Sequence, residues 1–188
     1  MRPSTKSRFP SETSDAVGLV IALLVRYPEI ATLVSHSAVG TLTLSFAISA
    51  RVDKNQQRCV REQVSEHVRT LLALEGETPD ALAVAFESHE STSFVRISRD
   101  VRTFGREELQ LLVAVLADRF GAQLIKSQTS DDEPLDDDDA PADELVEYAI
   151  EAMRDPGQQR SMVGFREEKR VLVYFVKSSK KAKARARS

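Results

Sequence analysis

The spacing of apolar residues between Thr41 and Ile125 switches several times, and this switching constrains the fold more than any other feature of the sequence. Apolar residues recur at every second position, then at helical spacing, then in two more alternating segments, and then again at helical spacing. A short apolar segment at 122–125 ends the series as a final strand. The predicted order is therefore β-α-β-β-α-β, which is typical of a ferredoxin-like (split βαβ) fold with an antiparallel sheet and both helices on one face.

Three segments, 41–49, 81–86 and 93–99, show the alternation of strands that bury one face. On the first two of these segments, the opposite face is predicted to carry only small residues, namely Thr43, Ser45, Ala47, Ala81, Ala83 and Ala85. Such a face permits close approach by a flat object, either an apolar helix of the same chain or the sheet of another subunit. RNA-binding domains with this strand order stack bases on aromatic residues, but here only Phe94 is expected on that face.

The two helices of the series are predicted at 53–75 and 105–120 from their apolar stripes. Asp53 is expected to cap the first of them, with Gln56 completing a capping box. In the second helix, Glu107 and Glu108 fall in the first turn, where negative charge is favourable.

An additional helix and strand, at about 16–25 and 30–35, are predicted before this series. The run Ala16–Val25 is apolar on every side but has ten residues, whereas a membrane span needs about 20. We therefore expect a helix that is buried on more than one face, and no membrane partner. Glu12 and Asp15 interrupt any secretory signal, and Cys59 is the only cysteine, so a cytoplasmic location is expected.

Three segments are too dense in charge to bury an apolar face. The first ten residues hold three basic residues, 131–144 holds nine acids, and 177–188 holds six basic residues. The predicted organisation is a flexible basic N-terminus (1–10), a main α+β domain (11–126), an acidic linker (127–141), a small helix–hairpin unit (142–176) and a disordered basic tail (177–188). Within the small unit, a helix from Pro141 to Arg154 precedes strands at 161–166 and 170–176.

The sequence contains no motif of an enzyme, a cofactor site or a metal site. Glycine-rich phosphate loops and a nucleophile elbow are absent, and the chain has only seven glycines. His36, His67, His89 and Cys59 are far apart in the sequence, so only clustering in space would indicate catalysis. We expect a non-enzymatic protein without a cofactor or a bound metal.

Basic residues provide the candidate binding sites. The tail carries Lys177, Lys180, Lys181, Lys183, Arg185 and Arg187, spaced by alanine and serine, a composition suited to contact with phosphates. A second candidate group, Arg96, Arg99, Arg102 and Arg106, runs from a strand to the next helix. On the 53–75 helix, Lys54, Arg58, Arg61 and Arg69 lie within one arc beside the apolar stripe, with acidic residues next to them.

Two hypotheses of function follow from these features. The first is a binding protein that associates with RNA or a ribonucleoprotein through its basic tail, with the Arg96–Arg106 group as the source of any specificity. The alternative is a protein–protein adaptor or regulator that uses the small-residue face of the sheet, with the tails only aiding solubility.

Overall fold

The computed structural model describes residues 13–127, 141–154, 161–167 and 170–176. The helices are α1 (Thr13–Arg26), α2 (Lys54–Leu74), α3 (Arg106–Phe120) and α4 (Pro141–Met153). The strands are β1 (Ile30–His36), β2 (Thr41–Ile48), β3 (Leu82–His89), β4 (Thr92–Asp100), β5 (Ser161–Glu167) and β6 (Arg170–Val176). Short 3-10 helices lie at Ser37–Val39 and Gly121–Gln123.

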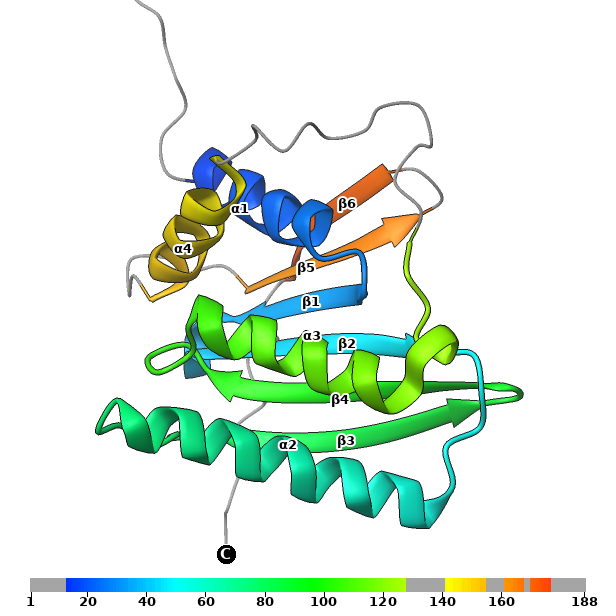
Figure 1. Ribbon diagram of the computed structural model, residues 1–188. Helices are drawn as coiled ribbons and strands as arrows, with labels where there is room; N and C mark the ends of the chain where they lie inside the picture. The colour runs from blue at the N-terminus through cyan, green and yellow to red at the C-terminus, as the bar shows by residue number, and fades with distance from the viewer. Residues whose placement is uncertain (1–12, 128–140, 155–160, 168–169, 177–188) are drawn as a thin grey trace, which may run out of the picture.

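The six strands form one antiparallel sheet in the order β3-β4-β2-β1-β5-β6 (Figure 1). The predicted α+β class and antiparallel sheet are therefore confirmed. Strands β2 and β3 lie on either side of β4 and are joined through α2. Strands β3 and β6 are the two edges of the sheet.

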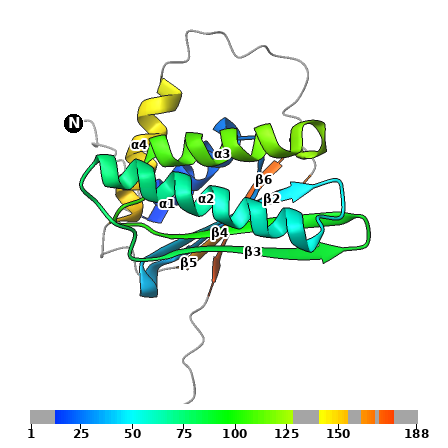
Figure 2. The same ribbon diagram turned by 60° about the horizontal axis from the view of Figure 1, so that its bottom comes forward.

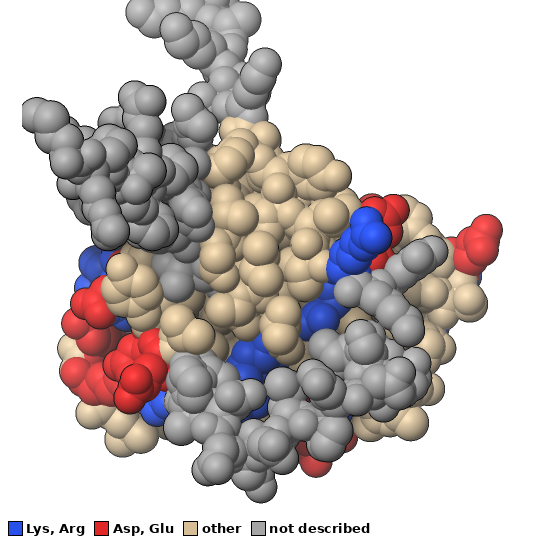
Figure 3. All heavy atoms as spheres, turned by 90° about the horizontal axis from the view of Figure 1, so that it is seen from above, with Lys and Arg blue, Asp and Glu red and all other residues tan. Residues whose placement is uncertain are grey.

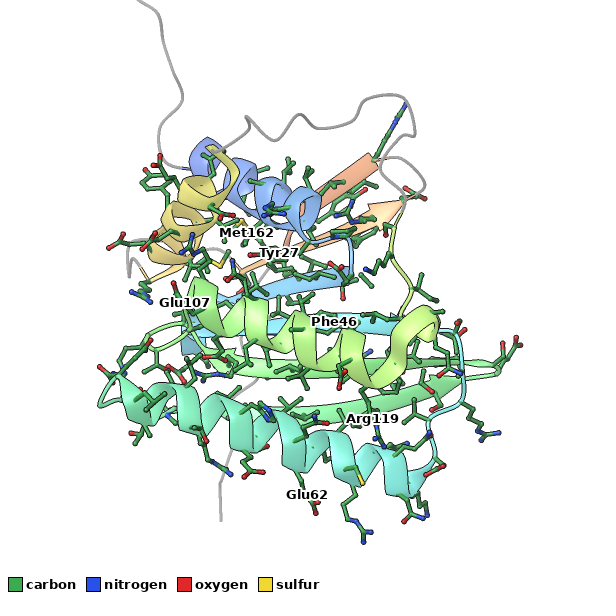
Figure 4. All side chains as sticks on the ribbon, viewed as in Figure 1. Tyr27, Phe46, Glu62, Glu107, Arg119 and Met162 are labelled. Carbon is green, nitrogen blue, oxygen red and sulfur yellow. The ribbon has the colours of Figure 1, made fainter. Side chains whose placement is uncertain are left out.

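All four helices lie on the same side of the sheet (Figure 2), as predicted for α2 and α3. The register places Leu33, Leu44 and Ile97 in one row across β1, β2 and β4, and all three are buried under the helices. In Figure 4, Phe46 lies between β2 and α3, whereas Glu62 points away from the outer side of α2. The core is thus a single layer between the sheet and the helices.

The capping box predicted at the start of α2 is present. The Asp53 carboxylate accepts from the Asn55 and Gln56 amides at 2.8 and 2.9 Å, and the Gln56 side chain accepts from the Asp53 amide at 3.0 Å. Four residues of the predicted stripe, Val60, Val64, Val68 and Leu72, are buried. Local sequence therefore determines both the start and the orientation of this helix.

The last strand of the predicted series is reduced to a single bridge. Residues 121–123 form a 3-10 helix, and only Leu124 pairs with the sheet, opposite Ile48 at the end of β2. The reason is that β1 occupies the rest of that side of β2, from Phe46 to Thr41. The prediction of a strand at 122–125 was wrong because it ignored this competition for one strand edge.

The helix–hairpin predicted as a small separate unit continues the sheet of the main domain. Strand β5 pairs with β1 between Thr32–Phe165 and Ser35–Met162, and Val146, Ala149 and Met162 join the common core. Residues 13–176 therefore share one sheet and one core within the described part of the chain.

Helix α1 covers the β5 end of the sheet and not the small-residue face. A Cβ atom added to Gly164 of β5 would lie 2.5 Å from Val20 and 2.9 Å from Leu24, so α1 packs directly on this glycine. The helix was expected to be buried on more than one face, and it contacts α4 as well as β1, β5 and β6. Its apolar residues Ile21 and Val25 are nevertheless 36% and 41% exposed. None of the described helices has both the length and the hydropathy that crossing a bilayer requires.

Candidate interaction surface

The sheet face opposite the helices is here called the open face, and no described helix covers it (Figure 2). Side chains of alternate residues point to this face. Because Leu33, Leu44 and Gly164 point to the helices, Val34, Thr43 and Val163 point the other way. The open face divides into two halves of different chemistry.

The half formed by β1, β5 and β6 is apolar and aromatic. The pairs Val34–Val163 and Phe165–Leu172 lie directly opposite one another in the register. The Phe165 and Tyr174 rings are stacked, with centroids 5.7 Å apart and planes 16° apart. Tyr174 remains 55% exposed. We name this group of five side chains the aromatic patch: Val34, Val163, Phe165, Leu172 and Tyr174.

The half formed by β2, β3 and β4 is small and polar, and its polar groups bond to each other. The Thr43 and Ser98 hydroxyls are 2.9 Å apart, and Arg96 forms an ion pair with Glu87. His89 also contacts the Glu87 carboxylate, and its ring meets Phe94 edge to face. The Glu87 pKa is lowered by the hydrogen bond from His89 and by the charge of Arg96.

The structure does not bring Arg96, Arg99, Arg102 and Arg106 together as a basic patch. Arg96 points to the open face, whereas Arg99, three residues on, points to the helices. Arg102 is bonded to Asp80 at 2.7 Å and to Glu77 at 3.0 Å, and Arg106 contacts Glu107 and Asp143 at 3.3 and 3.5 Å. Each arginine of this group thus has an acidic partner, which leaves little net positive charge for a phosphate.

Arg99 has a structural position, contrary to its prediction as a nucleic-acid contact. Its side chain is 1% exposed and forms two bonds to the Glu108 carboxylate, at 2.5 and 3.0 Å. It also donates to Asp100 and to the Thr103 hydroxyl. A buried guanidinium with these partners cannot reach a ligand on the surface. The alternation of β4 contained the signal, since Val95, Ile97 and Arg99 share one face.

Asp100 organises the turn after β4. Its carboxylate accepts from the Asp80 and Ala81 amides at 3.0 and 3.1 Å, and from the Thr103 amide and hydroxyl at 2.9 and 2.8 Å. Burial alone would raise the Asp100 pKa, but these bonds and Arg99 together hold it well below the ordinary range. The buried charges therefore hold the turn after β4 in place.

Arg61, in the basic arc of α2, blocks the β3 edge of the sheet. Its Nε donates to the Val84 carbonyl at 3.1 Å, and its guanidinium lies 5.2 Å from the centre of the Phe86 ring. This residue is thus engaged with the protein itself. It occupies a backbone acceptor that a further strand would otherwise use.

The described residues contain no cluster of His, Cys, Asp and Glu that could hold a metal ion. His67 bonds to the Gln63 carbonyl within α2, and Cys59 is exposed on the same helix. His36 ends β1 and His89 ends β3. A cavity of about 230 Å³ between α2, α3 and α4 is lined mainly by charged side chains, including Glu75, Glu107, Glu147 and Glu151.

The basic tail and most of the acidic linker lie outside the described residues, so the six tail positions Lys177, Lys180, Lys181, Lys183, Arg185 and Arg187 stay sequence-based predictions.

Sequence reasoning missed the aromatic patch, because it considered only the strands between 41 and 99. The hairpin predicted at 161–166 and 170–176 carried the signal, since its register places Val163, Phe165, Leu172 and Tyr174 on the same side.

Comparisons of this chain with models of protein families, with curated proteins and with solved structures gave no match. Functional inference therefore depends on the surfaces described above.

Proposed function

We propose that this chain is a non-enzymatic protein-binding module, with the aromatic patch of the open face as its docking surface. The observation that carries the proposal is the Phe165–Tyr174 stack with its exposed Tyr174 ring, surrounded by aliphatic side chains on a sheet face that no described helix covers. Aromatic residues with an apolar surround dominate the binding energy of many protein interfaces. The paired polar groups of the β3–β4 half suit the rim of such an interface.

The proposed partner is a protein segment that presents apolar side chains. Two features favour a protein over a nucleic acid at this surface. The Phe165 and Tyr174 rings stack on one another, which takes up one face of each ring, whereas base stacking requires accessible ring faces. The arginines of the Arg96–Arg106 group are neutralised by acids, whereas binding to phosphates depends on uncompensated positive charge.

The proposal retains two further expectations from the sequence. A ferredoxin-like description of residues 41–125 is supported by the order β2, α2, β3, β4, α3 and by the bridge of Leu124 to Ile48. A cytoplasmic location is supported by the single cysteine. RNA association through the basic tail is the competing hypothesis, and the experiment below separates the two.

The test is affinity capture from an extract of the source cells, followed by binding measurements with the purified partner. Four baits are compared: the wild type, Tyr174→Ser, Ala85→Ser as a control on the other half of the open face, and a deletion of 177–188. We expect one protein that is captured by the wild type, the control and the deletion variant, in the presence of nuclease. Tyr174→Ser should weaken the affinity of the purified partner about 30-fold, which is the loss of one aromatic hot spot of roughly 2 kcal/mol.

Two outcomes would contradict the proposal. Equal binding to wild type and Tyr174→Ser would show that the aromatic patch is not the docking surface. Capture that disappears with nuclease or with deletion of 177–188 would instead favour the RNA hypothesis. A thermal melt of Tyr174→Ser serves as the folding control, since a surface substitution on an edge strand should change stability little.

A further inference from the structure

Helix α4 presents a second apolar row beside the one that it buries. Val146 and Ile150 are buried in the common core, whereas Leu145 and Tyr148 are 45% and 58% exposed. Residues three and four positions apart share a helix face, so Leu145, Tyr148 and Ala152 lie in one row. We name this row the α4 seam.

Acidic residues border the α4 seam. Glu144 and Glu151 each precede a seam residue by one position, and both are exposed. In the described part of the chain, the ion pairs of α4 all come from Asp143, which contacts Arg26 at 3.4 Å and Arg106 at 3.5 Å. The charges of Glu144 and Glu151 are thus available to a partner.

No basic residue close to these two acids compensates them. Helix α4 itself contains none, and Arg154, which follows it, donates to the Val101 and Phe104 carbonyls at 3.1 and 2.8 Å. Figure 3 shows acidic side chains gathered on the side of the molecule where α4 lies, beside uncharged surface. This side of the molecule therefore combines exposed apolar groups with uncompensated negative charge.

This combination is typical of a helix that pairs with another helix. In such pairs, apolar residues three and four positions apart form the contact, and the charges beside them select the partner. A tyrosine suits this contact, because its ring buries a large apolar area while its hydroxyl group stays at the rim.

We propose that α4 docks an amphipathic helix of another protein, whose apolar row is flanked by lysine or arginine. The apolar residues of that helix would cover Leu145 and Tyr148, and its basic residues would pair with Glu144 and Glu151. The proposal does not rest on the proposed function, because α4 and the open face lie on opposite sides of the sheet (Figure 2).

Charge and side-chain size decide against other occupants of the α4 seam. In an antiparallel pair with α4 of a second copy, Glu144 and Glu151 would face the same residues of the other copy, and like charges repel. A nucleic acid would bring its phosphates to the same acidic row. The basic tail has the right charge, but its apolar residues are all alanines, which are too small to cover the Tyr148 ring.

The test selects binders of the full chain from a display library of helical peptides of about 20 residues. One set has an apolar row flanked by lysine or arginine, and a second set has the same row flanked by glutamate. A third set keeps the composition of the first but scrambles the apolar row. We expect enrichment of the first set alone, and the dissociation constants of its selected peptides are then measured by fluorescence anisotropy.

Substitutions in the seam should weaken the selected peptides. Leu145→Ala combined with Tyr148→Ala should raise their dissociation constants at least about tenfold. Leu74→Ala is the matched control, because Leu74 is 83% exposed on α2, and it should leave binding unchanged. Tyr174→Ser, on the opposite side of the sheet, should also leave it unchanged. Thermal melts show which variants fold.

Charge variants keep the test decisive if the apolar variants fail to fold. Glu144→Gln and Glu151→Gln change exposed positions, and each should weaken binding about two- to fivefold at low salt. This difference should disappear in about 1 M salt, which screens exposed charges. Glu62→Gln, on the outer side of α2, is the control and should have no effect.

Enrichment of no set, or of any set besides the first, would overturn the proposal. So would selected peptides whose affinity is the same for wild type and for the folded α4 variants. Deletion of 177–188 should not change the affinity, and a gain would show that the basic tail occupies the seam. A dimer in light scattering that the double substitution of Leu145 and Tyr148 dissociates would assign the seam to a second copy instead.

Discussion

The two ends of the sheet are built on opposite principles. At the β3–β4 end, charged and polar groups have partners within the molecule. Arg99 pairs with Glu108, Arg102 pairs with Asp80, and the Val84 carbonyl accepts a hydrogen bond from Arg61. At the β5–β6 end, the surface side chains are apolar and many remain exposed, including Tyr174. The β3–β4 end thus satisfies its own polar groups, whereas the β5–β6 end presents apolar surface, and for this reason we propose the β5–β6 end as the one that binds a partner.

The largest expected effect on stability comes from breaking the buried Arg99–Glu108 ion pair at the β3–β4 end of the sheet. Glu108→Ala should lower the free energy of unfolding by about 3–5 kcal/mol, because it leaves the Arg99 guanidinium buried without its main partner. Denaturant unfolding followed by circular dichroism measures this loss. Glu107→Ala removes the exposed neighbour on α3 and should change stability by less than about 0.5 kcal/mol. Equal effects of the two substitutions would show that stability does not depend on the Arg99–Glu108 ion pair.

The next largest effect on stability tests how α1 packs on the β5–β6 end of the sheet. Gly164→Ala should destabilise the protein by about 1–3 kcal/mol, since the added methyl group would overlap Val20 and Leu24 of α1. Gly18→Ala is the matched control, because nothing lies within 4 Å of its new Cβ atom. In a helix this control should stabilise by about 0.5–1 kcal/mol. A neutral Gly164→Ala would mean that α1 does not rest on β5.

The third prediction concerns how the contribution of Asp100 to stability depends on pH. The pKa of Asp100 is lowered by folding, so its carboxylate stabilises the protein above the unfolded value of about 4. This stabilisation is lost as the pH falls through the lower folded value. Asp100→Asn should therefore cost about 1–3 kcal/mol at neutral pH, and the difference from wild type should shrink below about pH 4. Unfolding curves of both proteins at several pH values measure this difference in the free energy of unfolding. A difference that grows toward acid pH would contradict the account.

The smallest effect on stability should accompany a clear change in association. Arg61→Ala should alter the free energy of unfolding by less than about 1 kcal/mol, because the side chain is exposed. It also frees the Val84 carbonyl, so the β3 edge should begin to pair. We expect species larger than those of the wild type in light scattering, whereas Arg58→Ala on the same helix should produce none. An unchanged mass distribution for Arg61→Ala would show that Arg61 does not protect this edge.

The sequence predicted most of the fold because its signals were local. The alternation of 41–49, the capping box at Asp53 and the stops at helix ends each depend on a few neighbouring residues. The strand predicted at 122–125 failed because its outcome depends on competition from β1, which pairs across a gap in the sequence. The position of α1 likewise depends on Gly164, far along the chain, whose role no local pattern reveals.

The candidate sites were harder to predict for the same reason. Arg99 was grouped with its neighbours in sequence, although the period of two in β4 placed it beside Ile97 in the core. The aromatic patch requires that β5 pairs with β1, and that long-range pairing brings Val163 next to Val34. Charge density was readable from the sequence, but ion pairing in space decides which charges are available to a partner.

Amide hydrogen exchange, read residue by residue with and without the purified partner of the proposed function, tests most directly which end of the sheet associates. The account predicts that the partner slows the exchange of the β5 and β6 amides around Phe165 and Tyr174. The Val84 amide should exchange at the same rate with and without the partner, because Arg61 covers the β3 edge at this position. Slower exchange at Val84, or unchanged exchange around Phe165 and Tyr174, would contradict the difference between the two ends of the sheet.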